Sequence, residues 1–73
     1  MGGFVKPDFA RGELEFRFEN GEVCIYGTAR GLQKLAEQCL QLIKGPAQQH
    51  IHLETTGLLT RQSAKTSIAI FDK

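Results

Sequence analysis

The residues of this chain best suited to chemistry lie in the segment HIHLE, where His50, His52 and Glu54 alternate with Ile51 and Leu53. On an extended strand, alternate side chains project from one face roughly 7 Å apart. The two imidazoles and the carboxylate should therefore share a face. Such groups can bind a metal, transfer protons or recognise a polar partner.

A metal centre or a catalytic site would need further groups beside this segment. A closed zinc site takes four protein ligands and a catalytic one takes three plus water, yet Cys24 is the only other plausible donor on the same face. Nucleophilic catalysis needs an activated Ser or Cys near a base and an orienting acid, and no nucleophile elbow surrounds Cys24. We predict no enzyme activity, no metal and no cofactor. A metal-dependent enzyme using His50 and His52 is a less favoured alternative.

Composition limits the size of the protein and the class of its partner. With 73 residues and 41% hydrophobic content, residues 1–73 should form one small domain. The formal net charge is +1, with three basic and five acidic side chains in residues 1–27 and six and three in residues 28–73. This distribution suits a protein partner better than nucleic acid.

Neither a membrane protein nor a disulfide-bonded one is expected. The N-terminal residues lack a secretory signal, and no apolar segment is long enough to span a bilayer, so we expect a cytoplasmic location and no membrane partner. Cys24 and Cys39 match no metal or redox spacing, and we predict that both are reduced thiols.

A β-hairpin should occupy residues 13–27. Asn20-Gly21 favours a two-residue type I′ turn, and Glu19 should pair with Glu22. One face should then be apolar, with Phe16, Phe18, Val23 and Ile25. The opposite face should carry Glu15, Arg17, Glu19, Glu22, Cys24 and Tyr26.

An amphipathic helix should follow over residues 28–44. Its core-facing stripe should contain Leu32, Leu35, Ala36, Cys39, Leu40 and Ile43. Thr28 is the expected N-cap. Gly45 can adopt the left-handed conformation after the helix, and Pro46 prevents continuation. A capped helix explains the segment YGTARG better than a phosphate site at the helix start does.

Two further strands, residues 49–54 and 66–72, should complete the domain, with Ile51, Leu53, Ile68 and Ile70 inward. The long loop between them should be ordered by packing of Leu58 and Leu59 or by a partner. Residues 1–12 form an N-terminal extension in which Phe4 and Phe9 should tuck against the domain.

The order ββαββ predicts an α+β fold in which one helix covers one face of a four-stranded, mainly antiparallel sheet. The sheet order 2-1-3-4 is favoured, and 1-2-4-3 stays possible. The other sheet face should be uncovered, with Tyr26 and Phe71 as exposed aromatic groups. Exposed aromatic groups beside mixed charges indicate a protein interface.

Three features point to a known family: GLQKLA at residues 31–36, HIHL at residues 50–53, and the final apolar strand SIAIF after a Leu-containing loop. Over roughly residues 13–72 the chain resembles the immunity protein 32 family, small bacterial proteins of polymorphic toxin systems. The resemblance implies a protein that binds a cognate toxin domain and blocks its active site or substrate groove, without catalysis. The binding residues we predict are His50, His52, Glu54, Glu15, Arg17 and Tyr26. The main alternative is a homodimeric structural or adaptor module in which the same sheet face pairs with its twin.

Overall fold

The computed structural model describes residues 6–45 and 50–71. Its elements are β1 (Leu14–Glu19), β2 (Glu22–Gly27), α1 (Ala29–Lys44), β3 (His50–His52), the short 3₁₀ helix η1 (Leu53–Thr55) and β4 (Ser67–Ala69). The α+β class and the order of elements are as predicted. The last two strands are shorter than predicted, and β3 ends at His52 because the chain turns into η1 at Leu53. The expectations for Phe4, Pro46 and the strand ends at residues 49 and 72 lie outside the described residues.

The hairpin has the predicted turn and register. Asn20 and Gly21 both have positive φ, 53° and 77°, as a type I′ turn requires. Glu19 pairs with Glu22, Phe18 with Val23, and Phe16 with Ile25. The local sequence pattern therefore predicted the hairpin correctly.

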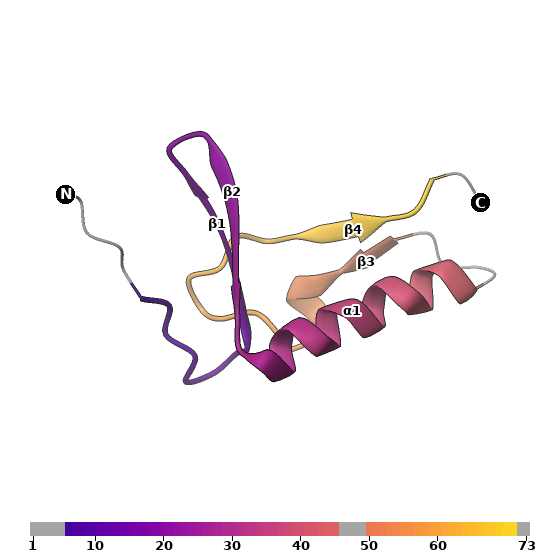
Figure 1. Ribbon diagram of the computed structural model, residues 1–73, viewed down its shortest axis with the longest axis horizontal. Coiled ribbons are helices and arrows are strands. Elements are labelled where there is room, and N and C mark those ends of the chain that lie inside the picture. Colours follow the sequence, from indigo (N-terminus) through magenta and orange to yellow (C-terminus); the bar gives the residue numbers. More distant parts are fainter. Residues whose placement is uncertain (1–5, 46–49, 72–73) are drawn as a thin grey trace.

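The prediction of one four-stranded sheet is wrong, because β1–β2 and β3–β4 form two separate antiparallel pairs. The free edge of β1 is occupied by the loop at residues 58–64. The carbonyl of Leu58 accepts hydrogen bonds from the Glu13 and Leu14 N–H groups, at 2.7 and 3.0 Å, and the Ala64 N–H donates to the Phe16 carbonyl at 2.9 Å. These bonds occupy the edge of β1 at Leu14 and Phe16, where β3 does not pair. The hairpin projects from the rest of the molecule, in which α1 lies beside β3 and β4 (Figure 1).

Helix α1 is rolled relative to the predicted orientation. Its buried residues are Gly31 and Leu42, whereas Leu32, Leu40 and Ile43 of the predicted stripe are exposed. One residue corresponds to about 100° of roll. The cause lies at the helix start: a Cβ on Gly31 would come within 2.1 Å of the Glu13 carbonyl oxygen, and the Thr28 N–H donates to that same oxygen at 3.1 Å. This close contact fixes which side of α1 faces the core.

The core lies where α1, the start of β1, β3 and the long loop meet. Its buried residues are Leu14, Phe16, Leu42, Ile51 and Leu53. Leu58 and Leu59 pack against them, which confirms that the long loop is ordered by its leucine pair. Burial of these side chains provides the main favourable free energy of folding for so short a chain.

The ends of α1 match the prediction at one terminus only. The Thr28 hydroxyl accepts a hydrogen bond from the Gly31 N–H at 2.9 Å, as an N-cap should. Gly45 is not left-handed, since its φ is −72° and its ψ is 132°. Its N–H donates to the Gln41 carbonyl at 2.8 Å. Within residues 6–45 and 50–71, no helix is both long and apolar enough to cross a bilayer.

Candidate protein-binding surface

The HIHLE segment exposes its histidines as predicted. β3 pairs with β4 so that His50 lies opposite Ala69 and His52 lies opposite Ser67, and all four residues are exposed. Ile51 and Leu53 are buried on the other side, toward α1. The face of the β3–β4 pair that points away from the helix is therefore polar and uncovered.

The two histidines and Glu54 form a connected cluster. The imidazole rings are 5.0 Å apart between centroids and lie edge to face. His52 Nδ1 is 3.6 Å from Glu54 Oε2, and Glu54 Oε1 accepts a hydrogen bond from the Thr66 N–H at 3.2 Å. Because the backbone of the following loop holds the carboxylate, the cluster has a defined geometry before any partner binds.

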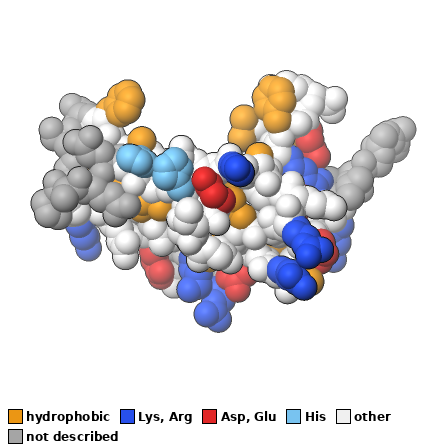
Figure 2. Space-filling model, turned by 180° about the vertical axis from the view of Figure 1, so that it is seen from behind, with side chains coloured by type: hydrophobic (Ala, Val, Ile, Leu, Met, Phe, Trp, Pro, Cys, Tyr) orange, Lys and Arg blue, Asp and Glu red, His pale blue; other side chains and the backbone are white. Residues whose placement is uncertain are grey.

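A concave surface, here called the trough, extends from this cluster to the hairpin. An apolar hollow of about 220 Å³ separates Phe18 and Val23 of the hairpin from Lys65 and Thr66 of the loop. Thr66 is bonded to Glu54, which links this hollow to the histidines. Figure 2 shows the histidines and charged groups in a hollow between apolar groups that project at either end.

We define the trough by its polar floor of His50, His52, Glu54 and Lys65 and its apolar ends of Phe18, Val23 and Phe71. Phe71 follows two residues after Ala69, just beyond the end of β4, and it is 85% exposed. Phe18 is 73% exposed. Exposed aromatic groups around mixed polar groups are typical of protein interfaces.

The sequence identified only part of the trough. It placed His50, His52, Glu54 and Phe71 on an uncovered face. It wrongly assigned Phe18 and Val23 to a hairpin face covered by the helix. On that face the buried side chains are Leu14 and Phe16. No local pattern distinguishes Phe18 and Val23 from the buried Phe16, because all three belong to the same apolar alternation of the hairpin.

Glu15, Arg17 and Tyr26 form a second cluster, on the opposite face of the hairpin from Phe18. Arg17 forms ion pairs with Glu15 and, at 3.2 Å, with Glu19, and its guanidinium carbon is 4.9 Å from the centre of the Tyr26 ring. The Tyr26 hydroxyl donates to Glu19 Oε1 at 2.9 Å. The structure therefore separates the six predicted binding residues into two groups of three.

The expectation that Glu15 lies on an open surface is wrong. Its side chain is 1% exposed, and its Oε1 accepts a hydrogen bond of 2.7 Å from the buried Thr60 hydroxyl. A buried carboxylate is tolerated when it is paired and hydrogen-bonded. Glu15 thus connects β1 to the long loop through its hydrogen bond with Thr60. We therefore do not include Glu15 in the candidate contact surface.

The hydrogen bond between Tyr26 and Glu19 changes the ionisation of both groups. Donation to the carboxylate, together with burial, raises the pKa of Tyr26 to about 12. The same bond, followed by the Arg17 ion pair, lowers the pKa of Glu19. The hydrogen bond to Glu15 is the main cause that raises the pKa of Arg17. The network therefore favours a charged Glu19 and a charged Arg17 but a neutral Tyr26.

Metal binding and thiol chemistry have little support among the described residues. Nowhere in residues 6–45 and 50–71 do three His, Cys, Asp or Glu side chains come together as a ligand set. Cys24 and Cys39 are free thiols, as predicted. Burial raises the pKa of the Cys24 thiol, which disfavours the thiolate needed for nucleophilic attack.

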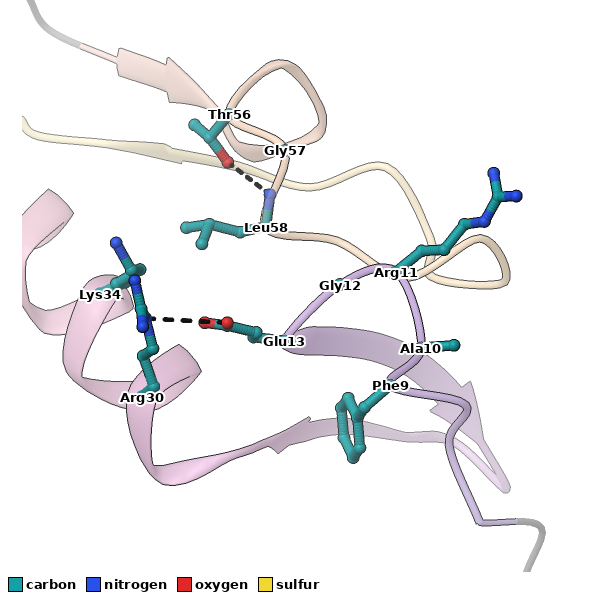
Figure 3. Close-up of a pocket in the computed structure, with 10 residues that line it drawn as sticks. All are labelled: Phe9, Ala10, Arg11, Gly12, Glu13, Arg30, Lys34, Thr56, Gly57 and Leu58. Atoms are coloured by element: carbon teal, nitrogen blue, oxygen red, sulfur yellow. Dashed lines mark hydrogen bonds and ion pairs between the residues drawn. The ribbon is translucent and has the colours of Figure 1, made fainter.

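A polar pocket of about 400 Å³ lies between residues 9–13, the start of α1 and the turn at residues 56–58 (Figure 3). Arg30 Nε is 3.8 Å from Glu13 Oε2, and Lys34 lies beside Arg30, whereas Arg11 extends away from them. The Glu13 carboxylate would repel a phosphate placed between these cations. The geometry therefore favours the capped-helix interpretation of YGTARG.

Comparison of this chain with protein-family models, curated proteins and solved structures found no match.

Proposed function

We propose that this protein is a protein-binding inhibitor that neutralises a cognate bacterial toxin domain by placing the trough over its active site or substrate groove. The toxin is suggested by the resemblance in the sequence. The observation that carries the binding role is the trough itself, in which a fixed polar cluster lies between two highly exposed apolar ends.

The trough has the composition of a recognition surface and lacks that of a reaction site. Phe71, Phe18 and Val23 supply apolar area that a partner would remove from water, and exposed apolar clusters of this kind mark interaction sites. Glu54 and Lys65 supply one charge of each sign, and the histidines supply polar contacts. Such groups confer specificity by electrostatic complementarity, while the aromatic anchors supply most of the affinity.

The partner should present a matching arrangement. A convex loop or helix end with polar groups at its centre and apolar groups at both sides would fit the trough. Because the Thr66 backbone already fixes Glu54, little ordering entropy would be lost there on binding. Inhibition by occlusion would then be stoichiometric and would need no turnover.

The test uses a candidate toxin domain encoded by the gene adjacent to that of this chain. Calorimetric titration would give the affinity, and the toxin's own activity would be assayed at increasing ratios of this protein. We expect inhibition that is complete at equimolar protein. The Phe71→Ser variant and the His50→Ala plus His52→Ala variant should each weaken binding by roughly 1 to 3 kcal/mol.

The matched control is Gln41→Ala, which removes an exposed side chain on α1 outside the trough. It should leave affinity unchanged. Equal loss of affinity for the control and the trough variants would contradict the assignment of the trough. Binding without any inhibition would retain the trough as an interface but remove the toxin from the proposal.

A further inference from the structure

The roll of α1 leaves a second apolar surface uncovered, which adjoins the trough only on the hairpin, where Ile25 and Val23 share one face of β2. It consists of residues whose side chains share one side of the molecule, here called the helix face: Ile25, Leu32, Ala36, Cys39, Leu40 and Ile43. All six are exposed. Leu32 packs at Gly27, where an added Cβ would lie 3.0 Å from Leu32 Cγ, so the helix face continues onto β2 toward Ile25.

We propose that a second copy of this chain covers the helix face, with the two α1 helices packed antiparallel about a two-fold axis. Along α1, the side chains of the helix face vary in size: Leu32 is large, Ala36 and Cys39 are small, and Ile43 is large. The spacings between them are four, three and four residues. This pattern is the same in either direction. An antiparallel copy therefore places its Ile43 against Leu32 and its Cys39 against Ala36.

The small residues stand where the two helices would approach each other most closely. Ala36 and Cys39 at the crossing permit an interaxial distance near the lower end of the usual range, about 8 Å. Large residues then close both ends of the contact. A self-complementary patch of this kind is what an isologous two-fold interface requires.

A groove beside the helix face provides a place for Ile25 on β2 of the second copy. It has a volume of about 310 Å³ and lies between Cys39, Leu42 and Ile43 of α1 and Ile68 and Ile70 of the β4 segment. In the antiparallel arrangement, Leu32 of the second copy reaches Ile43. The adjoining Ile25 of that copy would then face this groove.

The exposed area agrees with what a stable dimer needs. The four large side chains of the helix face are each 46–60% exposed. With Ala36 and Cys39 they present on the order of 450 Å² of apolar surface per chain. A standard-size interface takes about 800 Å² from each partner, of which somewhat more than half is apolar.

The dimer leaves the trough accessible. His50 and His52 project from the side of the β3–β4 pair opposite to the core and α1. The contact proposed here is made through α1, β2 and the groove at Ile68 and Ile70, on the other side of that pair. This arrangement differs from a dimer in which the histidine face is buried. It would carry two troughs, so each dimer would bind two partner molecules.

The first test is sedimentation equilibrium of the full chain over a wide range of concentration, with Ile43→Glu and Gln41→Glu as a matched pair. Both variants add one negative charge at an exposed position in the last turns of α1. Ile43 belongs to the helix face, and Gln41 lies outside it. Ile43→Glu should raise the dimer dissociation constant about 30-fold or more, while Gln41→Glu should leave it unchanged. Circular dichroism verifies that each variant is folded.

The second test does not depend on the folding of a variant at the interface. In the antiparallel pairing, the two Cys39 residues lie within one helical turn of each other across the axis. Copper-catalysed oxidation of the Cys24→Ser chain should therefore give a disulfide-linked dimer through Cys39. A dimer that does not cross-link, or that Ile43→Glu leaves intact, would overturn the proposed interface. A chain that is monomeric at every concentration, or that binds lipid vesicles without self-association, would also overturn it.

Discussion

Two adjacent residues of α1 provide a sensitive test of the helix roll. Leu42 is 3% exposed and belongs to the core, whereas Ile43 is 60% exposed. The hydrophobic pattern of the sequence places Ile43 in the buried stripe and does not include Leu42 in it. Replacing each residue in turn by alanine therefore distinguishes the two orientations.

The expected magnitudes follow from these exposures. Leu42→Ala removes a buried side chain and leaves a cavity, which typically costs about 2 to 5 kcal/mol. Ile43→Ala loses only the smaller buried part of its side chain, and the better helix propensity of alanine offsets a few tenths of a kcal/mol of that loss. We expect a net change of no more than about 1 kcal/mol.

Thermal unfolding followed by circular dichroism measures both variants. For a domain of this size, 1 kcal/mol corresponds to a shift of about 4 to 8 °C in the melting temperature. Leu42→Ala should thus lower the melting temperature by at least about 8 °C. Because the total free energy of unfolding of so short a chain is small, a larger loss could leave the variant unfolded. A larger loss for Ile43→Ala than for Leu42→Ala would refute the roll and, with it, the exposed helix face.

Three further predictions concern the polar clusters. Thr60→Val removes the hydroxyl that donates to the buried Glu15 carboxylate and should lower the free energy of unfolding in urea by about 1 to 3 kcal/mol. The control Thr55→Val, at an exposed threonine, should change it by less than about 0.5 kcal/mol. Equal effects would contradict the role of Glu15. The chain's single tyrosine, followed by ultraviolet absorbance, should ionise with a pKa of about 12, and Glu19→Gln should bring the midpoint back toward 10.0; an unchanged midpoint would show that the hydrogen bond is absent. Because folding raises this pKa, the bond's contribution to stability is complete below pH 10.0 and is lost as pH rises through about 12. Finally, His50→Ala plus His52→Ala should change the free energy of unfolding by no more than about 1 kcal/mol, and a larger loss would assign the histidines to the fold.

Local signals predicted the elements well, because each depends on residues close in sequence. Asn20-Gly21 determined the hairpin turn, and Thr28 determined where α1 begins. The alternation in HIHLE correctly separated His50 and His52 from the buried Ile51. These features required no knowledge of how the elements pack.

The arrangement of the elements could not be predicted in the same way, because it depends on contacts between distant residues. Amphipathicity gave α1 an apolar arc wider than the core could cover, and the contact between Gly31 and Glu13 decided which part of that arc was buried. Likewise, the Leu58 carbonyl, and not β3, is bonded to the edge of β1. The hydrophobic pattern of the sequence predicts neither the Gly31–Glu13 contact nor the pairing of the loop with β1.

The measurement that bears most directly on the trough as the binding surface is a nuclear magnetic resonance titration of the isotopically labelled chain with the unlabelled toxin domain. We expect the largest shifts of backbone and side-chain signals at His50, His52, Glu54, Lys65 and Phe71, with Phe18 and Val23 also affected. Signals of Gln33, Glu37 and Gln41 on the exposed side of α1 should stay in place. Shifts confined to α1, or to the Glu15 and Tyr26 face of the hairpin, would contradict the proposal that the trough binds the partner.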